Sequence, residues 1–166
     1  MIRFTIAAVL GMIMTFSVQT AQAQNYTTAV GARLGSPISL SAKHFINETS
    51  AVEGFVGTRG WATYRWFVVG GAYQYHRPIE SVDNLQYYFG AGASVFFWTY
   101  DFVFSPEQDF STTSFGVQGY LGLDYTLEDT PINLTLDWVP TIYVGNGFST
   151  GFAGGFGALG VRYVLK

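Results

Sequence analysis

The sequence of 166 residues contains no cysteine. Disulfide bonds and thiolate metal sites are therefore excluded, and so is a lipid anchor on a cysteine behind the N-terminal apolar segment. Charge is also scarce, because Asp, Glu, Lys and Arg make up only 11% of the chain, whereas soluble domains carry about 25%. No basic run is present, so nothing in the charge pattern indicates nucleic-acid binding.

Beyond its N-terminus the chain has no apolar run that reaches the roughly 20 residues of a membrane-spanning helix. The N-terminus itself has Arg3, the apolar residues 4–18 and the small-residue site Ala21-Gln22-Ala23. This arrangement is typical of a secretory signal peptide. The alternative, a transmembrane anchor, needs a longer apolar run. We predict a signal peptide over residues 1–23 and one mature domain over residues 24–166.

Glycine and aromatic residues are abundant instead, with 20 Gly, 15 Phe, 11 Tyr and 4 Trp. From residue 115 to 138, apolar residues alternate with small or polar ones on both sides of the turn 128–131. Period-two alternation predicts strands whose two faces meet different surroundings. In a soluble sandwich a second sheet would cover the apolar face, but lipid can cover it equally well.

The alternation and the turn residues predict eight strands, at residues 26–34, 38–46, 51–59, 64–75, 85–98, 115–127, 132–138 and 152–165. The predicted fold is an all-β, eight-stranded antiparallel up-and-down transmembrane β-barrel. An even number of strands puts both ends of the domain in the periplasm. The longest loop, 99–111, then lies on the outer side, as is usual for such barrels.

The interior of an eight-stranded barrel is just filled by side chains, so inward charges must neutralise one another. Alternation points five charged side chains inward near the periplasmic end: Lys43, Glu53, Asp124, Asp137 and Arg162. We expect Lys43 to lie across from Glu53, and Arg162 to separate Asp124 from Asp137. The cluster is interpreted as a structural plug, and the alternative is a proton path or substrate site. Arg33 and Arg59 are expected inside the outer end, near loop carboxylates or lipopolysaccharide phosphates.

Catalytic residues are not expected. A hydrolase needs a nucleophile, a base and an orienting carboxylate within hydrogen-bond reach. His44 shares the outward parity of Leu40, so it cannot converge with Ser41 and Glu53. His76 is expected to point inward at the edge of a periplasmic turn, as an interfacial residue. The sequence predicts no catalytic site, no cofactor and no metal site.

The loop 99–111 mixes aromatic side chains with carboxylates. It is a candidate surface for a partner or for cations that bridge lipopolysaccharide, and the alternative is an aromatic rim under a solvated cap. The residues concerned are Tyr100, Asp101, Phe102, Phe104, Glu107, Asp109 and Phe110.

Several short segments carry a resemblance to known proteins: Lys43-His44-Phe45, Ala51-Val52-Glu53-Gly54, Gly122-Leu123-Asp124-Tyr125, Leu136-Asp137-Trp138-Val139-Pro140 and Gly160-Val161-Arg162-Tyr163. With them the mature chain resembles the small outer-membrane β-barrel proteins common in Bacteroidetes, distantly similar to the OmpX and OmpA type. The resemblance implies the outer membrane of a Gram-negative bacterium. One departure is the C-terminus, which ends in Lys166 where many proteobacterial barrels end in the Phe read by the assembly machinery.

We therefore expect a monomeric outer-membrane protein with a structural or adhesion-like surface role and a packed, non-conducting lumen. Its expected partners are outer-membrane lipids, lipopolysaccharide, the barrel-assembly machinery during insertion and an unidentified extracellular molecule. Two alternatives stay open. One is an enzyme that modifies lipid A or phospholipid. The other is a narrow pore or carrier of small apolar ligands, which would need a cavity beside the inward glycines Gly90, Gly92, Gly116, Gly122, Gly154 and Gly160.

Overall fold

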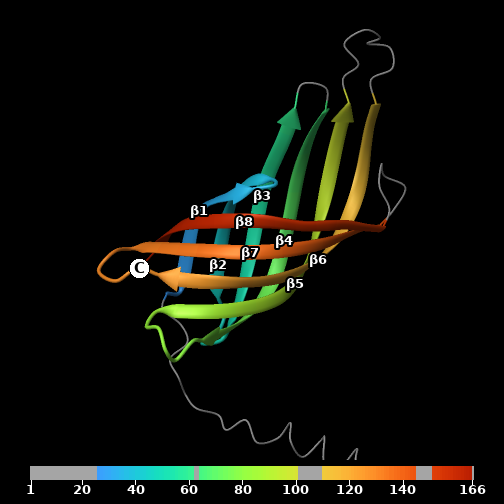
Figure 1. Cartoon of the computed structure of the whole chain (residues 1–166). Coiled ribbons are helices and arrows are strands. Elements are labelled where there is room, and N and C mark those ends of the chain that lie inside the picture. Colours follow the sequence, from blue (N-terminus) through green and yellow to red (C-terminus); the bar gives the residue numbers. More distant parts are fainter. Residues whose placement is uncertain (1–25, 62–63, 101–109, 145–150, 166) are drawn as a thin grey trace, which may run out of the picture.

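A computed structural model describes residues 26–61, 64–100, 110–144 and 151–165 of the chain. Figure 1 shows the strands β1 to β8 following one another around a barrel. Their bounds are Thr28–Gly35 (β1), Ile38–Phe45 (β2), Ser50–Trp61 (β3), Tyr64–Pro78 (β4), Leu85–Tyr100 (β5), Phe110–Thr126 (β6), Ile132–Val144 (β7) and Gly151–Leu165 (β8). Within these ranges no helix is long and apolar enough to cross a membrane.

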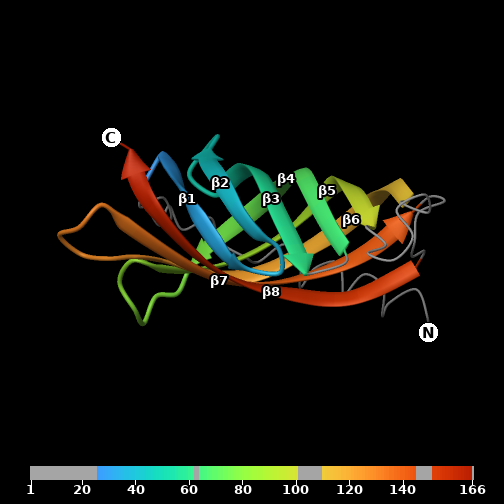
Figure 2. The same ribbon diagram turned by 90° about the horizontal axis from the view of Figure 1, so that it is seen from above.

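Each strand pairs antiparallel with its neighbour in sequence, and β1 pairs with β8 to close the barrel. Thr28 lies opposite Leu165, so the described chain begins and ends at the same end of the barrel, as Figure 2 also shows. The prediction of a closed, eight-stranded, all-β barrel is confirmed. The predicted signal peptide lies outside the described residues.

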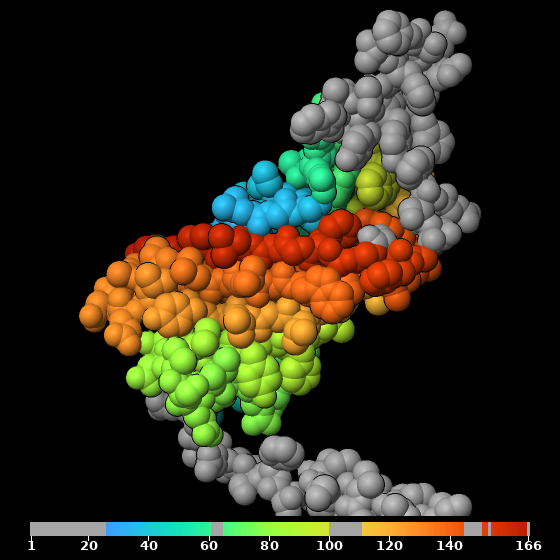
Figure 3. Space-filling model, viewed as in Figure 1, coloured from blue at the N-terminus to red at the C-terminus, as the bar shows by residue number. Residues whose placement is uncertain are grey.

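The two faces of the strands differ as the alternation predicts. In β2, Ser39, Ser41 and Lys43 are buried, whereas Ile38 and Leu40 are exposed. The exposed face carries apolar side chains around the whole barrel, and the side chains of β7 and β8 form the continuous outer surface in front of Figure 3. The buried charged side chains therefore lie inside the barrel together with aromatic ones, and the outer face is mostly apolar.

Several strands are longer than the sequence predicts. β4 continues to Pro78, which pairs with Gln86, because a proline at the end of a strand removes little of the ladder. β7 runs through Pro140 to Val144. Pro140 fits because Gly119 lies beside it, where an added Cβ would come within 3.2 Å of the proline Cγ. β6 begins at Phe110, so the predicted loop 99–111 is shortened from both sides.

The turns at the end that holds the termini are tight. Asn47 Oδ1 accepts hydrogen bonds from the backbone N–H groups of Thr49 and Ser50, at 3.0 Å and 2.8 Å. Asp129 has a φ of 56° in the turn between β6 and β7, a conformation that aspartate tolerates better than most residues. Both turns were predicted from their residue types.

Candidate functional site in the lumen of the barrel

The part of the lumen at the end that holds the termini contains an ion pair between Lys43 and Asp124. Lys43 Nζ lies 3.0 Å from Asp124 Oδ2 and 4.4 Å from the centre of the Tyr88 ring. Asp124 also accepts hydrogen bonds from the Tyr26 hydroxyl at 3.0 Å and from Asn133 Nδ2 at 2.5 Å. Tyr26 precedes β1, so the N-terminal segment contributes a side chain that closes this end of the lumen.

The next ion pair joins Arg162 to Glu53. Arg162 Nη2 bonds directly to Glu53 Oε1. The same guanidinium donates from Nε to Ser41 Oγ at 3.0 Å and from Nη1 to Thr135 Oγ1 at 2.9 Å. Glu53 accepts a second hydrogen bond, from Gln74 Nε2, at 2.8 Å. Strands β2, β3, β4, β7 and β8 are thus tied together through this one pair.

The third ion pair lies between Arg33 and Asp137. Arg33 Nη2 donates to Asp137 Oδ1 at 2.7 Å, and Arg33 Nε lies 3.9 Å from Glu53 Oε1. The Tyr88 hydroxyl donates to the other oxygen of Asp137 at 2.7 Å. Arg33 therefore links this pair to the carboxylate of the preceding one, so the charges form a network.

The prediction that Lys43 lies across from Glu53 is confirmed by the β2–β3 ladder. The ion pairs nevertheless join other strands, since Lys43 pairs with Asp124 and Glu53 pairs with Arg162. The long side chains reach partners on non-adjacent strands, because the interior of an eight-stranded barrel is narrow enough for side chains from different walls to meet.

The expected opposition of Asp124 and Asp137 is wrong. Asp124 lies opposite Thr135, and Asp137 lies opposite Gly122, so the two carboxylates are displaced along the hairpin. Each has its own cation, Lys43 for Asp124 and Arg33 for Asp137. No arginine is needed between them.

The two arginines expected at the outer end behave differently. Arg33 is buried and belongs to the lumenal network, where its carboxylate partners among the described residues are Asp137 and Glu53. Arg59 is exposed at the outer rim and donates to Ser36 Oγ.

The network is balanced in charge. In the described part of the lumen, three cationic side chains face three carboxylates, and none of the six residues is more than 5% exposed. A buried charge without a partner is strongly unfavourable, whereas each of these charges has an ionic partner and further hydrogen bonds. The six residues, called here the lumenal network, are Arg33, Lys43, Glu53, Asp124, Asp137 and Arg162.

The inward glycines make room for large neighbours and do not leave a cavity. A Cβ added to Gly122 would lie 2.6 Å from Cζ of Tyr88, and one added to Gly160 would lie 3.0 Å from Nη1 of Arg162. The same holds for Gly70 beside Phe55, Gly92 beside Tyr120, and Gly116 beside Phe96. Gly90 packs against the backbone of Tyr73, and among the six glycines named for a carrier only Gly154 faces open space.

Aromatic side chains fill the lumen above the network. Trp66, Phe96, Trp98 and Tyr143 form a cluster in which neighbouring ring centres lie 4.9–5.9 Å apart. Such tilted and edge-to-face pairs pack closely. The path along the barrel axis is thus occupied by rings above and by ion pairs below.

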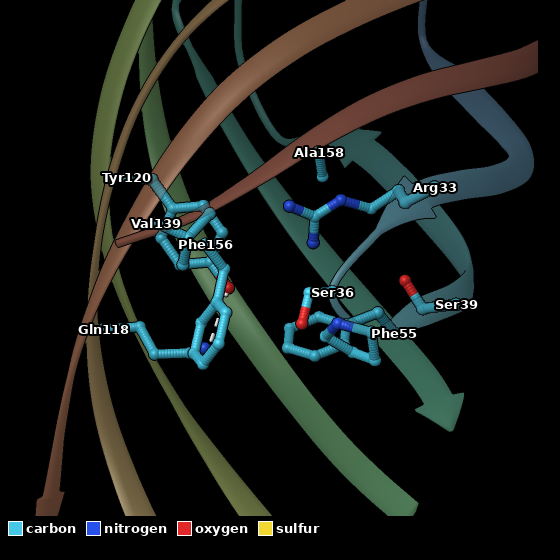
Figure 4. A pocket seen from close by; sticks show the side chains of 10 residues that line it. Arg33, Ser36, Ser39, Phe55, Gln118, Tyr120, Val139, Phe156 and Ala158 are labelled. Atoms are coloured by element: carbon cyan, nitrogen blue, oxygen red, sulfur yellow. Dashed lines mark hydrogen bonds between the residues drawn. The ribbon is translucent and has the colours of Figure 1, made fainter. Parts of the chain in front are cut away.

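One small pocket lies beside Arg33, on the outer side of the network, and is shown in Figure 4. Its enclosed volume is about 20 Å³, which is room for about one water molecule. The guanidinium of Arg33 lies 5.5 Å from the centre of the Phe55 ring and 5.8 Å from that of Tyr120. Ser36 and Phe156 also line it.

The histidines are far from any catalytic arrangement. His44 is exposed on the outer face and its Nδ1 lies 2.8 Å from Thr28 Oγ1. The interfacial position predicted for His76 is wrong, because β4 continues past it. His76 is fully buried, stacks on Tyr88 and bonds through Nδ1 to Gln86 Oε1 at 3.1 Å. In the described ranges no cluster of three or more His, Asp or Glu side chains is able to hold a metal ion.

The candidate binding loop falls on residues that the structure does not describe. Asp101, Phe102, Phe104, Glu107 and Asp109 lie outside the described ranges. Tyr100 and Phe110 are the last and first residues of β5 and β6, which pair with each other at the base of this loop.

Sequence reasoning found the five inward charges near the periplasmic end but missed several of their partners. Tyr26, Tyr88 and Asn133 donate to the carboxylates. Tyr88 and Asn133 occupy strand positions that alternation points into the lumen, so the sequence pattern could have identified them as partners. No strand pattern marks Tyr26, because it precedes β1.

No protein-family model matches the chain, and no curated protein matches it in sequence. Solved structures do. Neisserial surface protein A is 17% identical with a TM-score of 0.62, over 83% of this chain and 93% of that one. The N-terminal β-barrel domain of Pseudomonas aeruginosa OprF is 14% identical with a TM-score of 0.64, over 86% of this chain and 100% of that one. A third structure is that of Ail, the attachment invasion locus protein of Yersinia pestis, in complex with the heparin analogue sucrose octasulfate. It is 14% identical with a TM-score of 0.51, over 83% of this chain and 94% of that one.

These structures share the fold, an eight-stranded barrel of the outer-membrane type. The chain has the fold of an outer-membrane β-barrel. Its apolar outer face is suited to hydrocarbon. Because the barrel is closed, the backbone N–H and C=O groups along the paired strands bond to neighbouring strands and are not exposed to lipid. The location in the outer membrane of a Gram-negative bacterium agrees with the sequence prediction, whereas the Bacteroidetes origin stays a prediction.

Proposed function

We propose that this protein is a monomeric structural and surface-interaction component of the outer membrane, with a lumen that does not conduct ions. The observation that carries the proposal is the lumenal network. Three cations and three carboxylates, each paired and buried, occupy the interior that a pore would need to keep open. The aromatic cluster around Phe96 and Trp98 lies above it.

If the lumen does not conduct ions, the protein acts through the exposed surfaces of the barrel. The membrane-embedded strands then act as a rigid anchor for the outer connections, of which 101–109 is the longest in the sequence. We propose an adhesion-like role for these connections, with lipopolysaccharide or an extracellular molecule as the partner. The barrel-assembly machinery would insert the chain. The name of Ail, an attachment protein with the same fold, is in keeping with such a role.

An enzyme that modifies lipid is disfavoured by the positions of the histidines. His44 faces outward beside Thr28, and His76 is enclosed between Phe45 and Tyr88. Neither bonds to a serine and a carboxylate in the described part of the chain, so no triad is assembled.

Three measurements test the proposal. In planar bilayers the purified protein should give no steady conductance, and steady single-channel steps would contradict a closed lumen. Lipid A mass spectra from cells with and without the protein should be identical, and a new or missing acyl group would favour the enzyme. The surface role is tested by deleting residues 102–109, which should abolish cell attachment while the barrel still folds.

A further inference from the structure

The outer end of the barrel is uneven. The hairpin of β1 and β2 ends at residues 35–38, where Gly35 pairs with Ala158 of β8 and Ile38 pairs with Thr58 of β3. Both flanking strands continue past the hairpin, β8 through residues 151–157 and β3 through residues 59–61. Figure 1 shows β3 and β8 extending beyond the short blue hairpin between them. We call the space bounded by these three segments the lateral notch.

The backbone along the notch is unpaired on one side. Residues 151–152 and 155–157 of β8 pair with β7, and the ladder is irregular at 153–154. Within the described residues the other edge of this segment has no strand partner. This edge lies at a level where the outer face is still apolar, since Ile142, Val144 and Phe152 are each at least 50% exposed. Unpaired N–H and C=O groups are strongly unfavourable against hydrocarbon. Among the described residues this edge has no polar partner, which suits an occupant that has polar groups of its own.

The pocket of Figure 4 opens from the notch into the lumen, because Ser36 and Pro37 of the hairpin and Phe156 of β8 line it. Arg33 lies in its depth, 5% exposed, and Arg33 Nε has no hydrogen-bond partner among the described residues. Phe55 and Phe156 form apolar walls. Polar side chains line the pocket as well, from Ser36, Ser39, Gln118 and Tyr120. A recess of this size suits one small oxygen acceptor.

The charge at the mouth of the notch is positive. Arg59 is exposed, and its guanidinium donates to Ser36 Oγ, which itself lines the pocket. In the described part of the chain the exposed carboxylates lie on the turns at the opposite end, and these are Glu48, Glu80, Asp83, Glu128 and Asp129. Guanidinium groups bind phosphate through two parallel hydrogen bonds. An anion that reaches the outer rim would find Arg59 at the notch and no nearby described carboxylate outside the lumen.

A second copy of the barrel does not fit the unpaired edge. All copies insert in the same direction, and barrel strands are tilted by about 35–45° from the barrel axis. Two β8 edges that meet across an interface would therefore run in the same vertical direction and cross at a wide angle, which does not allow a ladder to form. A membrane lipid, which carries polar and apolar groups on one molecule, suits this edge better.

We propose that the lateral notch binds a phosphorylated lipid of the outer leaflet. The phosphate binds Arg59, oxygen and amide groups of the linkage region bond to the unpaired β8 edge, and the acyl chains lie along the apolar outer face. This site is independent of the outer connections, so it stands or falls separately from the proposed surface role.

Native mass spectrometry of the purified mature protein tests the site, with bisphosphorylated lipid A and its dephosphorylated form as probes. We expect a one-to-one adduct with the phosphorylated form, and an at least tenfold weaker adduct for Arg59→Gln. Arg77→Gln, at the opposite end of the barrel, is the matched control and should bind like the wild type. Equal binding of both lipids, or equal loss in both variants, would overturn the proposal.

The position of the lipid is tested by labelling, since the chain has no native cysteine. A fluorophore on Ile38→Cys at the notch should be quenched by spin-labelled bisphosphorylated lipid more strongly than one on Val117→Cys. The two side chains are comparably exposed, at 61% and 56%, but Val117 lies on β6. Equal quenching at positions 38 and 117 would show that both fluorophores contact only the surrounding bilayer, and it would overturn the proposal. A photocrosslink from position 38 to a polypeptide in cell membranes would assign the notch to a protein and also overturn the proposal.

Discussion

Arg33 and Asp137 are 104 residues apart in sequence and form a 2.7 Å ion pair across the lumen. The pair joins β1 to β7, two strands that are not neighbours in the barrel. It also leads to Glu53, which lies 3.9 Å from Arg33 Nε. Because each charge in the lumenal network has partners on other strands, the network is expected to hold the barrel closed as a unit.

Asp137→Asn should destabilise the barrel strongly. The change removes the charge that neutralises Arg33 while leaving the shape of the side chain, so a buried guanidinium loses its closest carboxylate. Breaking a buried ion pair in this way typically costs about 3–5 kcal/mol. Urea unfolding in lipid vesicles measures the difference in the free energy of unfolding. Glu128→Gln, on an exposed turn, is the control and should change it by less than about 0.5 kcal/mol.

Lys43 and Asp124 should be energetically coupled. Lys43→Met leaves the Asp124 carboxylate with only the Tyr26 and Asn133 hydrogen bonds, whereas the double variant with Asp124→Leu removes both charges. The double variant should be more stable than the sum of the two single changes indicates, by at least about 1 kcal/mol. A double-mutant cycle of unfolding free energies measures this coupling. Strict additivity would show that the two side chains act independently.

Gly160→Ala should disturb the lumen, because the added methyl group would collide with Thr135 Oγ1 and press on Arg162. Overpacking of this kind costs about 1–3 kcal/mol. Gly54→Ala is the matched control, since nothing lies within 4 Å of the position of its added Cβ. The temperature at which the band shifts in electrophoresis without boiling compares the two. Equal shifts for both variants would contradict a tightly filled interior.

His76→Ala should weaken the periplasmic end of the barrel. The substitution leaves a hole between Phe45 and Tyr88 and removes the hydrogen bond with Gln86, with an expected loss of about 2–5 kcal/mol in unfolding free energy. His44→Ala, on the outer face, should change stability by less than about 0.5 kcal/mol. Neither variant should alter lipid A in a mass spectrum. A change in lipid A that tracks with either histidine would instead indicate catalysis.

Pairings inside the lumen were the least predictable part of the site. The inward direction of Lys43, Glu53 and Arg162 follows from alternation along each strand, and the structure buries all three. The choice of partner does not follow from alternation. Lys43 faces Glu53 in the ladder but bonds to Asp124 on β6, because a closed barrel of this diameter places opposite walls within reach of one side chain.

The sequence alone determined the number of strands, the direction of most side chains and the apolar outer surface. These properties are local, since side chains alternate with a period of two wherever the backbone is extended. Only the tertiary structure decided which acid meets which base, how glycines and rings share the interior, and where the short β1–β2 hairpin leaves a notch. Those features depend on the stagger of the strands around the closed barrel, and no single strand carries that information.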